Sequence, residues 1–351
     1  MTNERPIDGG RRHLEDILIV GAVHALLSLF TFLLATLVGS PFVPWFDDAP
    51  LVLAGLLISL VLLGVVWDGT LISVGLAAEG ISTITGRHGL RSISVETMRP
   101  RRFFTHGPMP LVLILATAVS ILGTSNITLI NIELLSDAHR YRDVLFWNIE
   151  GPLLESLSSL QINPKWWDRL YHSAWFVEIL AAFILVVIGR GSRLVLQYCV
   201  SMIVLFYIGR LVGVLNPVMG PAFFRPELFA HLDGTISAAA MEKVGALMQQ
   251  PPEQVVHAGG ILLGGISAMP SLHIGMVTLT AYWLARAHPL TLLITVPWVI
   301  AVWFATVLLG WHYISDGAGG IALAAGSIAL ATWLVRAASM TTVPERASAS
   351  N

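Results

Sequence analysis

Long apolar runs separated by short polar segments occupy most of the 351-residue chain. A helix needs about 20 mostly apolar residues to cross roughly 30 Å of hydrocarbon, and most of the runs approach or reach this length. The pattern predicts transmembrane helices at about residues 17–38, 51–67, 109–130, 174–189, 194–215, 274–287, 290–309 and 319–335. We therefore expect an all-α, polytopic membrane protein with about eight transmembrane helices.

The second apolar run decides the topology, because it continues past Asp68 to about residue 84 and is too long for one span but short for two. Short loops rich in Lys and Arg stay in the cytoplasm. If the run is one span, 13 of the 20 basic residues share one side: Arg5, Arg11, Arg12, Arg87, Arg91, Arg99, Arg101, Arg102, Arg190, Arg193, Arg286, Arg336 and Arg346. We therefore predict that both termini are cytoplasmic. We expect the membrane to be a bacterial inner membrane. Residues 131–173, 216–273 and 310–316 then lie outside.

Two of the outer segments have helical patterns of their own. Residues 141–170 include Leu153, Leu154, Leu157 and Leu160 at helical spacing, which predicts an amphipathic helix lying in the membrane interface rather than an ordinary loop. Residues 217–270 are rich in Pro, Gly and charge, and contain a possible short helix at about 238–250.

Composition supports the membrane assignment and excludes several classes of function. Hydrophobic residues make up 55% of the chain and charged residues 12%, against about 25% charged in soluble domains. The net charge is −2, and no nucleic-acid partner is expected. The single cysteine, Cys199, excludes an intramolecular disulfide and a cysteine-rich metal site.

Two short motifs place ionisable groups at predicted helix ends. The stretch "SAMPSLHIGM" contains His273 at the start of the sixth span, and "GWHYISD" follows the seventh span and contains His312 and Asp316. The sixth and seventh spans are antiparallel neighbours, so both histidines return to the outer surface. Residues four apart on a helix share a face, so Asp316 can orient the imidazole of His312 and stabilise its charged form.

This arrangement predicts a catalytic set. His312 would act as nucleophile, Asp316 would hold its ring, and His273 would protonate a leaving alkoxide and later activate the acceptor as general base. For phosphate binding, Ser271 and the helix start after Pro270 provide hydroxyl and amide donors.

Arg210 and Arg225 are the predicted phosphate-binding cations, because arginine binds phosphate oxygens bidentately. Simpler alternatives remain for each residue. Arg210 can be an anchor that snorkels to the interface, and Arg225 an exposed loop charge. Asp316 can cap the last helix, and the two histidines can be ordinary interfacial residues.

The motifs resemble those of the type-2 phosphatidic acid phosphatase superfamily. Its second motif, Pro-Ser-Gly-His, appears here as "PSLH" ending at His273, and its third motif retains His312 and Asp316. The forms "MPSLH" and "HYxxD", with the segments "NPVMGP" and "WDRLYHSAW", are most similar to the inositol phosphorylceramide synthase branch. The resemblance runs from about residue 109 to 335.

The chain also departs from the superfamily pattern. The Ser-Arg pair of the third motif falls on Ala305 and Thr306. The Arg-Pro of the first motif matches Arg225 and Pro226, but Val218 stands where a basic residue is expected seven positions earlier. The departures affect the predicted phosphate ligands and leave the two histidines and the aspartate unchanged.

The resemblance implies three regions: two N-terminal helices and a basic cytoplasmic loop at 1–108, a six-helix catalytic core at 109–338, and a flexible cytoplasmic tail at 339–351. It implies a lipid phosphotransferase with a phosphohistidine intermediate, acting on a lipid phosphate or phospholipid, with a polyol, a lipid or water as hydroxyl acceptor. With water the protein would be a lipid phosphate phosphatase. A proton-linked transporter and an inactive scaffold are further alternatives. No metal or other cofactor is expected, because the implied chemistry requires none and no metal-binding motif appears.

Overall fold

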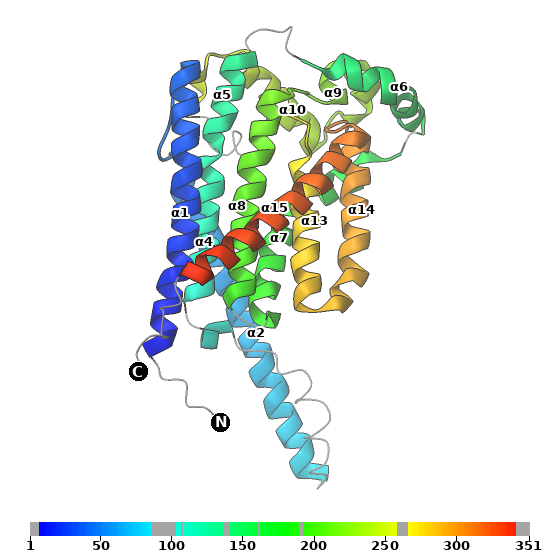
Figure 1. Cartoon of the computed structure of the whole chain (residues 1–351). Helices are drawn as coiled ribbons and strands as arrows, with labels where there is room; N and C mark the ends of the chain where they lie inside the picture. Colours follow the sequence, from blue (N-terminus) through cyan, green and yellow to red (C-terminus); the bar gives the residue numbers. More distant parts are fainter. Residues whose placement is uncertain are drawn as a thin grey trace.

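The computed structural model describes residues 7–85, 103–106, 108–135, 141–160, 162–189, 192–257 and 266–341. These residues form a bundle of long helices with no strand among them (Figure 1). The α-helices in chain order are α1 (Ile7–Val38), α2 (Ala49–Thr85), α4 (Met109–Gly123), α5 (Ser125–Leu135), α6 (Asp143–Ser159), α7 (Pro164–Ile188), α8 (Ser192–Leu215), α9 (Pro221–Phe224), α10 (Ile236–Met248), α11 (Pro252–Val255), α13 (Leu272–Ala287), α14 (Leu292–Leu308) and α15 (Ile314–Thr341). Among the described residues they are joined by the short 3₁₀ helices η1 (Phe103–His106), η3 (Pro226–Leu232) and η4 (Pro289–Thr291).

Seven segments of the described chain are long and apolar enough to cross a membrane, so the protein is an all-α, polytopic integral membrane protein. They lie in α1, α2, α4 with α5, α7, α8, η4 with α14, and α15. The sixth predicted span is not among these seven; it corresponds to α13, which has only 16 residues. It packs against α7, α8, α14 and α15 in the middle of the bundle. The count of eight stays a prediction.

The long second apolar run forms the single helix α2, which agrees with one span there. The basic residues of the loop that follows (Arg87, Arg91, Arg99, Arg101 and Arg102) lie outside the described residues, as does the chain from residue 342.

The segment 141–170 is two helices, not the one amphipathic helix predicted. α6 ends at Ser159, and α7 begins at Pro164, ten residues before the predicted span. The physical reason lies at Asn163, whose side chain accepts a hydrogen bond from the Lys165 N–H at 3.0 Å, while Pro164 occupies the first helical position. Both features favour a new helix start.

The core of the bundle is built around α8. Its side chains Cys199, Ile203, Leu205 and Tyr207 are fully buried and belong to the largest apolar cluster. α13 and α15 pack on α8 from one side and α4 from another, whereas α1 and α2 lie at the edge of the bundle with many exposed apolar side chains. α6, α9 and α10 gather at one end of the bundle (Figure 1).

Candidate active site

His273 is the second residue of α13, and two contacts of Ser271 fix the start of that helix. The Ser271 hydroxyl is the N-cap and accepts a hydrogen bond from the Ile274 N–H at 3.4 Å. The Ser271 N–H donates to the backbone carbonyl of Asp316 at 2.9 Å. This second bond ties the helix that carries His273 to Asp316, which lies four residues after His312.

His312 lies in a tight turn between α14 and α15. Gly310 adopts φ +70°, and a Cβ there would lie 2.6 Å from the Phe229 ring. The N–H groups of Trp311 and His312 both donate to the carbonyl of Thr306, at 3.1 and 3.3 Å. The turn therefore requires glycine and holds His312 against the end of α14.

His312 and Asp316 are brought together as a buried pair. Nδ1 of His312 lies 3.4 Å from Oδ2 of Asp316, and the two residues are 7% and 0% exposed. The same Oδ2 accepts a hydrogen bond from the Tyr313 N–H at 2.8 Å. Since Nδ1 faces the carboxylate, Nε2 is the nitrogen left for chemistry.

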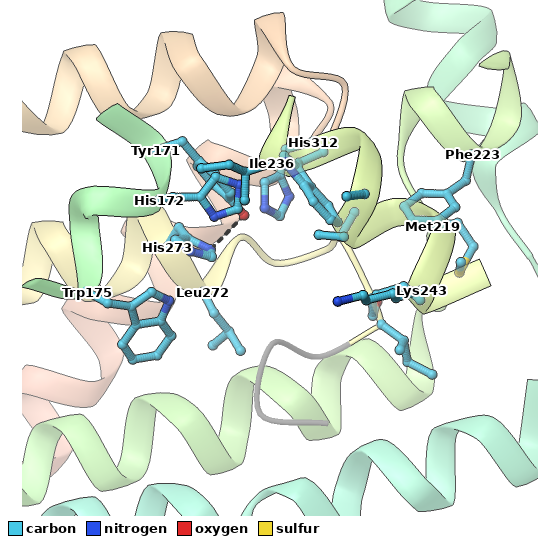
Figure 2. A pocket seen from close by; sticks show the side chains of 17 residues that line it. Tyr171, His172, Trp175, Met219, Phe223, Ile236, Lys243, Leu272, His273 and His312 are labelled. Atoms are coloured by element: carbon cyan, nitrogen blue, oxygen red, sulfur yellow. Dashed lines mark hydrogen bonds between the residues drawn. The ribbon is translucent and has the colours of Figure 1, made fainter. Parts of the chain in front are cut away.

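The two histidines line one pocket of about 420 Å³ (Figure 2). Its polar lining also includes Tyr171, His172, Lys243 and Ser267. The remaining wall is mostly apolar and consists of Trp175, Met219, Phe223, Ile236, Ala239, Ala240, Val244, Ile266, Ala268, Leu272 and Trp311. A site with a small polar cluster and a large apolar wall suits an amphipathic ligand.

Tyr171 orients His273. Its hydroxyl lies 3.3 Å from Nδ1 of His273, and the two rings lie 4.5 Å apart between centroids (Figure 2). Trp175 contacts the edge of the same imidazole, with 6.0 Å between centroids. Nε2 of His273 is therefore the nitrogen available to a ligand, as it is in His312.

A second histidine–aspartate pair joins α7 to α10. Nε2 of His172 lies 3.4 Å from Oδ1 of Asp168 and 3.2 Å from the Ser237 hydroxyl. The Asp168 carboxylate accepts the N–H groups of Ile236 and Ser237 at 2.8 and 2.9 Å. A carboxylate at a helix N-terminus is stabilising, so Asp168 fixes α10 beside the pocket.

Lys243 is carried on α10, and its ammonium points into the pocket from the side opposite His273 (Figure 2). It is the one Lys or Arg among the pocket-lining residues of the described chain. Sequence reasoning did not select it, although a short helix was predicted at 238–250.

The predicted phosphate-binding residues lie elsewhere. Arg210 donates to the Thr128 hydroxyl and lines a second, smaller cavity, which shares Ile266, Ser267 and Leu272 with the lining of the pocket. Arg225 pairs with Glu227 at 3.7 Å, and its guanidinium lies 5.7 Å from the Trp147 ring centroid. Neither arginine lines the pocket, and neither does Ser271.

Two ionisable groups beside the turn lie outside the membrane-spanning segments. Burial raises the pKa of the Tyr313 phenol, which keeps it protonated. Burial also raises the pKa of the Asp143 carboxyl, and the N–H groups of Met219 and Gly220 oppose this rise. Among the described residues, no three His, Cys, Asp or Glu side chains are grouped as they would be to hold a metal ion.

Comparison with known families gives a match over the part of the chain that forms the pocket. The family model described as "PAP2 superfamily" matches residues 140–330, more than half of the chain. The matched segment contains the pocket histidines, Asp316 and Lys243. Neither the curated proteins nor the solved structures give a significant match.

Proposed function

The chain belongs to the PAP2 superfamily, and on that premise we propose that it is a membrane lipid phosphotransferase working through a phosphohistidine intermediate. Membership indicates a function of the lipid phosphatase or phosphotransferase kind, with lipid phosphates as substrates. The observation that carries the finer proposal is the placement of His312 and His273 in one pocket, with Asp316 buried directly behind His312.

In the first half-reaction, Nε2 of His312 attacks the phosphorus of the lipid. The P–N bond forms as the bond from phosphorus to the leaving oxygen breaks, and His273 in its protonated form gives its proton to that oxygen. The ring of His312 becomes positively charged at this stage. The carboxylate of Asp316, 3.4 Å from Nδ1, stabilises that charge.

In the second half-reaction, His273 takes the proton of the acceptor hydroxyl while the acceptor oxygen attacks phosphorus. The P–N bond breaks, and its electron pair returns to His312. A polyol or lipid acceptor makes the protein a transferase, as in the inositol phosphorylceramide synthase-like branch. Water as acceptor makes it a lipid phosphate phosphatase that uses the same site.

Lys243 supplies the positive charge that a phosphate group needs in the pocket, and the apolar wall accommodates acyl or isoprenoid chains. The sequence also predicts three phosphate ligands that do not line the pocket, Arg210, Arg225 and Ser271. Their role in phosphate binding stays a proposal, and it would require them to act from outside the pocket lining. We place the site at the outer face of a bacterial inner membrane, with both chain termini in the cytoplasm.

The test measures head-group release and exchange from labelled phospholipids and isoprenoid phosphates in detergent, with and without added inositol or diacylglycerol. Native protein is compared with His312→Ala and with His288→Ala, whose exposed histidine lies outside the pocket lining. We expect turnover and covalent phosphate labelling to be lost in His312→Ala alone. Products that depend on the added acceptor identify a transferase. Equal turnover in all three proteins would overturn the proposal.

A further inference from the structure

A carboxylate on helix α6 accepts hydrogen bonds from the start of α15. Glu150 accepts hydrogen bonds from the first two backbone N–H groups of α15, that of Ile314 at 2.5 Å and that of Ser315 at 3.0 Å. Asp316 is the next residue along the chain. Glu150 and Ile314 are 164 residues apart in sequence, so this is a tertiary contact between two helices and not a local helix cap.

A second carboxylate on the same face of α6, that of Asp143, binds the segment at Met219 and Gly220, which packs against the turn before α15. Asp143 lies two helical turns before Glu150 and accepts the N–H groups of Met219 and Gly220, both at 2.9 Å. It also accepts the Tyr313 hydroxyl at 3.3 Å. Gly220 is seated so closely that a Cβ there would lie 2.4 Å from the carbonyl oxygen of Trp311.

The backbone amides of the turn are divided between two carboxylates. Asp316 accepts the Tyr313 N–H, and Glu150 accepts the next two. Oδ1 of Asp316 is buried and has no hydrogen-bond partner among the described residues. Without Glu150, the amides of Ile314 and Ser315 would be left unsatisfied, and the nearest carboxylate of their own turn is that of Asp316.

We propose that Glu150 is a positioning residue, which satisfies the amides at the start of α15 so that Asp316 stays directed at His312. This inference rests on the proposed function, because it assigns a task to the His312–Asp316 pair. Glu150 does not line the pocket, so it acts through Asp316 and not on the substrate.

The experiment is a double-mutant cycle in the full-length protein with Glu150→Gln and Asp316→Asn. Gln is nearly isosteric with Glu, but it offers one acceptor oxygen in place of two. With the labelled phospholipid or isoprenoid phosphate that native protein turns over as donor, we expect Glu150→Gln to lower kcat about 10- to 100-fold, the loss that a small misplacement of a reacting group causes. KM for that labelled lipid should change less than about twofold.

In the Asp316→Asn background, the same change should lower kcat less than about threefold, because the group through which Glu150 acts is already disabled. Equal losses in both backgrounds, or no loss in the native background, would overturn the inference. Unchanged turnover in Asp316→Asn alone would instead overturn the proposed function, so the two failures are distinguishable.

Two controls keep the cycle interpretable. Glu155→Gln removes an exposed carboxylate on the same helix and should leave kcat unchanged. If Glu150→Gln does not purify as a folded protein, Glu150→Asp replaces it in the cycle. The Asp side chain is one methylene shorter than Glu, which weakens its hold on the two amides. Because Asp retains the charge and both acceptor oxygens, we expect it to lower kcat less than Gln would.

Discussion

Replacing Asp316 by Asn tests the catalytic pair most directly. Asn has the shape of Asp and retains an oxygen that accepts the Tyr313 N–H, so the turn should stay folded. What it loses is the negative charge 3.4 Å from Nδ1 of His312. A pair of unit charges at that distance attracts by about 5 kcal/mol at an effective dielectric constant of about 20. Because the charge on His312 develops during P–N bond formation, this energy is lost from the transition state and should lower kcat by roughly 10³- to 10⁴-fold.

The assay is a single-turnover measurement of phosphate transfer from labelled lipid to the protein, followed by steady-state turnover. Thermal unfolding in detergent checks that the variant is folded. Asp233→Asn removes an exposed carboxylate outside the pocket and serves as the matched control. A rate of phosphate transfer in Asp316→Asn within threefold of native would refute the role given to this charge.

Two further predictions concern substrate binding and stability. Lys243→Ala should raise KM for an anionic lipid about tenfold with little change in kcat, less so at high salt, and Lys243→Arg should restore binding; an unchanged KM would exclude this cation from phosphate binding. Gly220→Ala should lower the unfolding temperature by several degrees, because φ is +108° and a Cβ would lie 2.4 Å from a backbone oxygen. At Gly245 nothing lies within 4 Å of an added Cβ, so Gly245→Ala should leave the unfolding temperature unchanged. Equal unfolding temperatures for the two variants would contradict this account.

Much of the membrane architecture can be predicted from hydrophobic length alone. Both ends of α8 and α14, and the C-terminal end of α1, lie close to the limits of their apolar runs, because the solvent boundary sets both. The start of α7 was missed since its first turns carry Trp166, Trp167 and Asp168, which are polar or interfacial side chains that a hydropathy rule assigns to a loop. Local capping by Asn163 determined that boundary instead.

The candidate site divides in the same way. His273, His312 and Asp316 belong to short motifs at adjacent helix ends, so sequence spacing predicts their proximity. Lys243 and Glu150 approach the pocket and the turn only because α10 and α6 pack there through tertiary contacts, and no local pattern encodes such packing. The direction of Arg210 depends likewise on its neighbour Thr128, 82 residues away.

The burial of Cys199 gives the chain a practical property. It is the sole cysteine, and it is 0% exposed in the middle of α8. A water-borne maleimide therefore finds no accessible thiol on the folded native protein, and any cysteine introduced at the surface becomes a unique chemical handle. Ser159→Cys at the end of α6 and His288→Cys in the connection from α13 to α14 both replace exposed residues, so labelling of intact cells assigns each to a side of the membrane without first removing a native thiol.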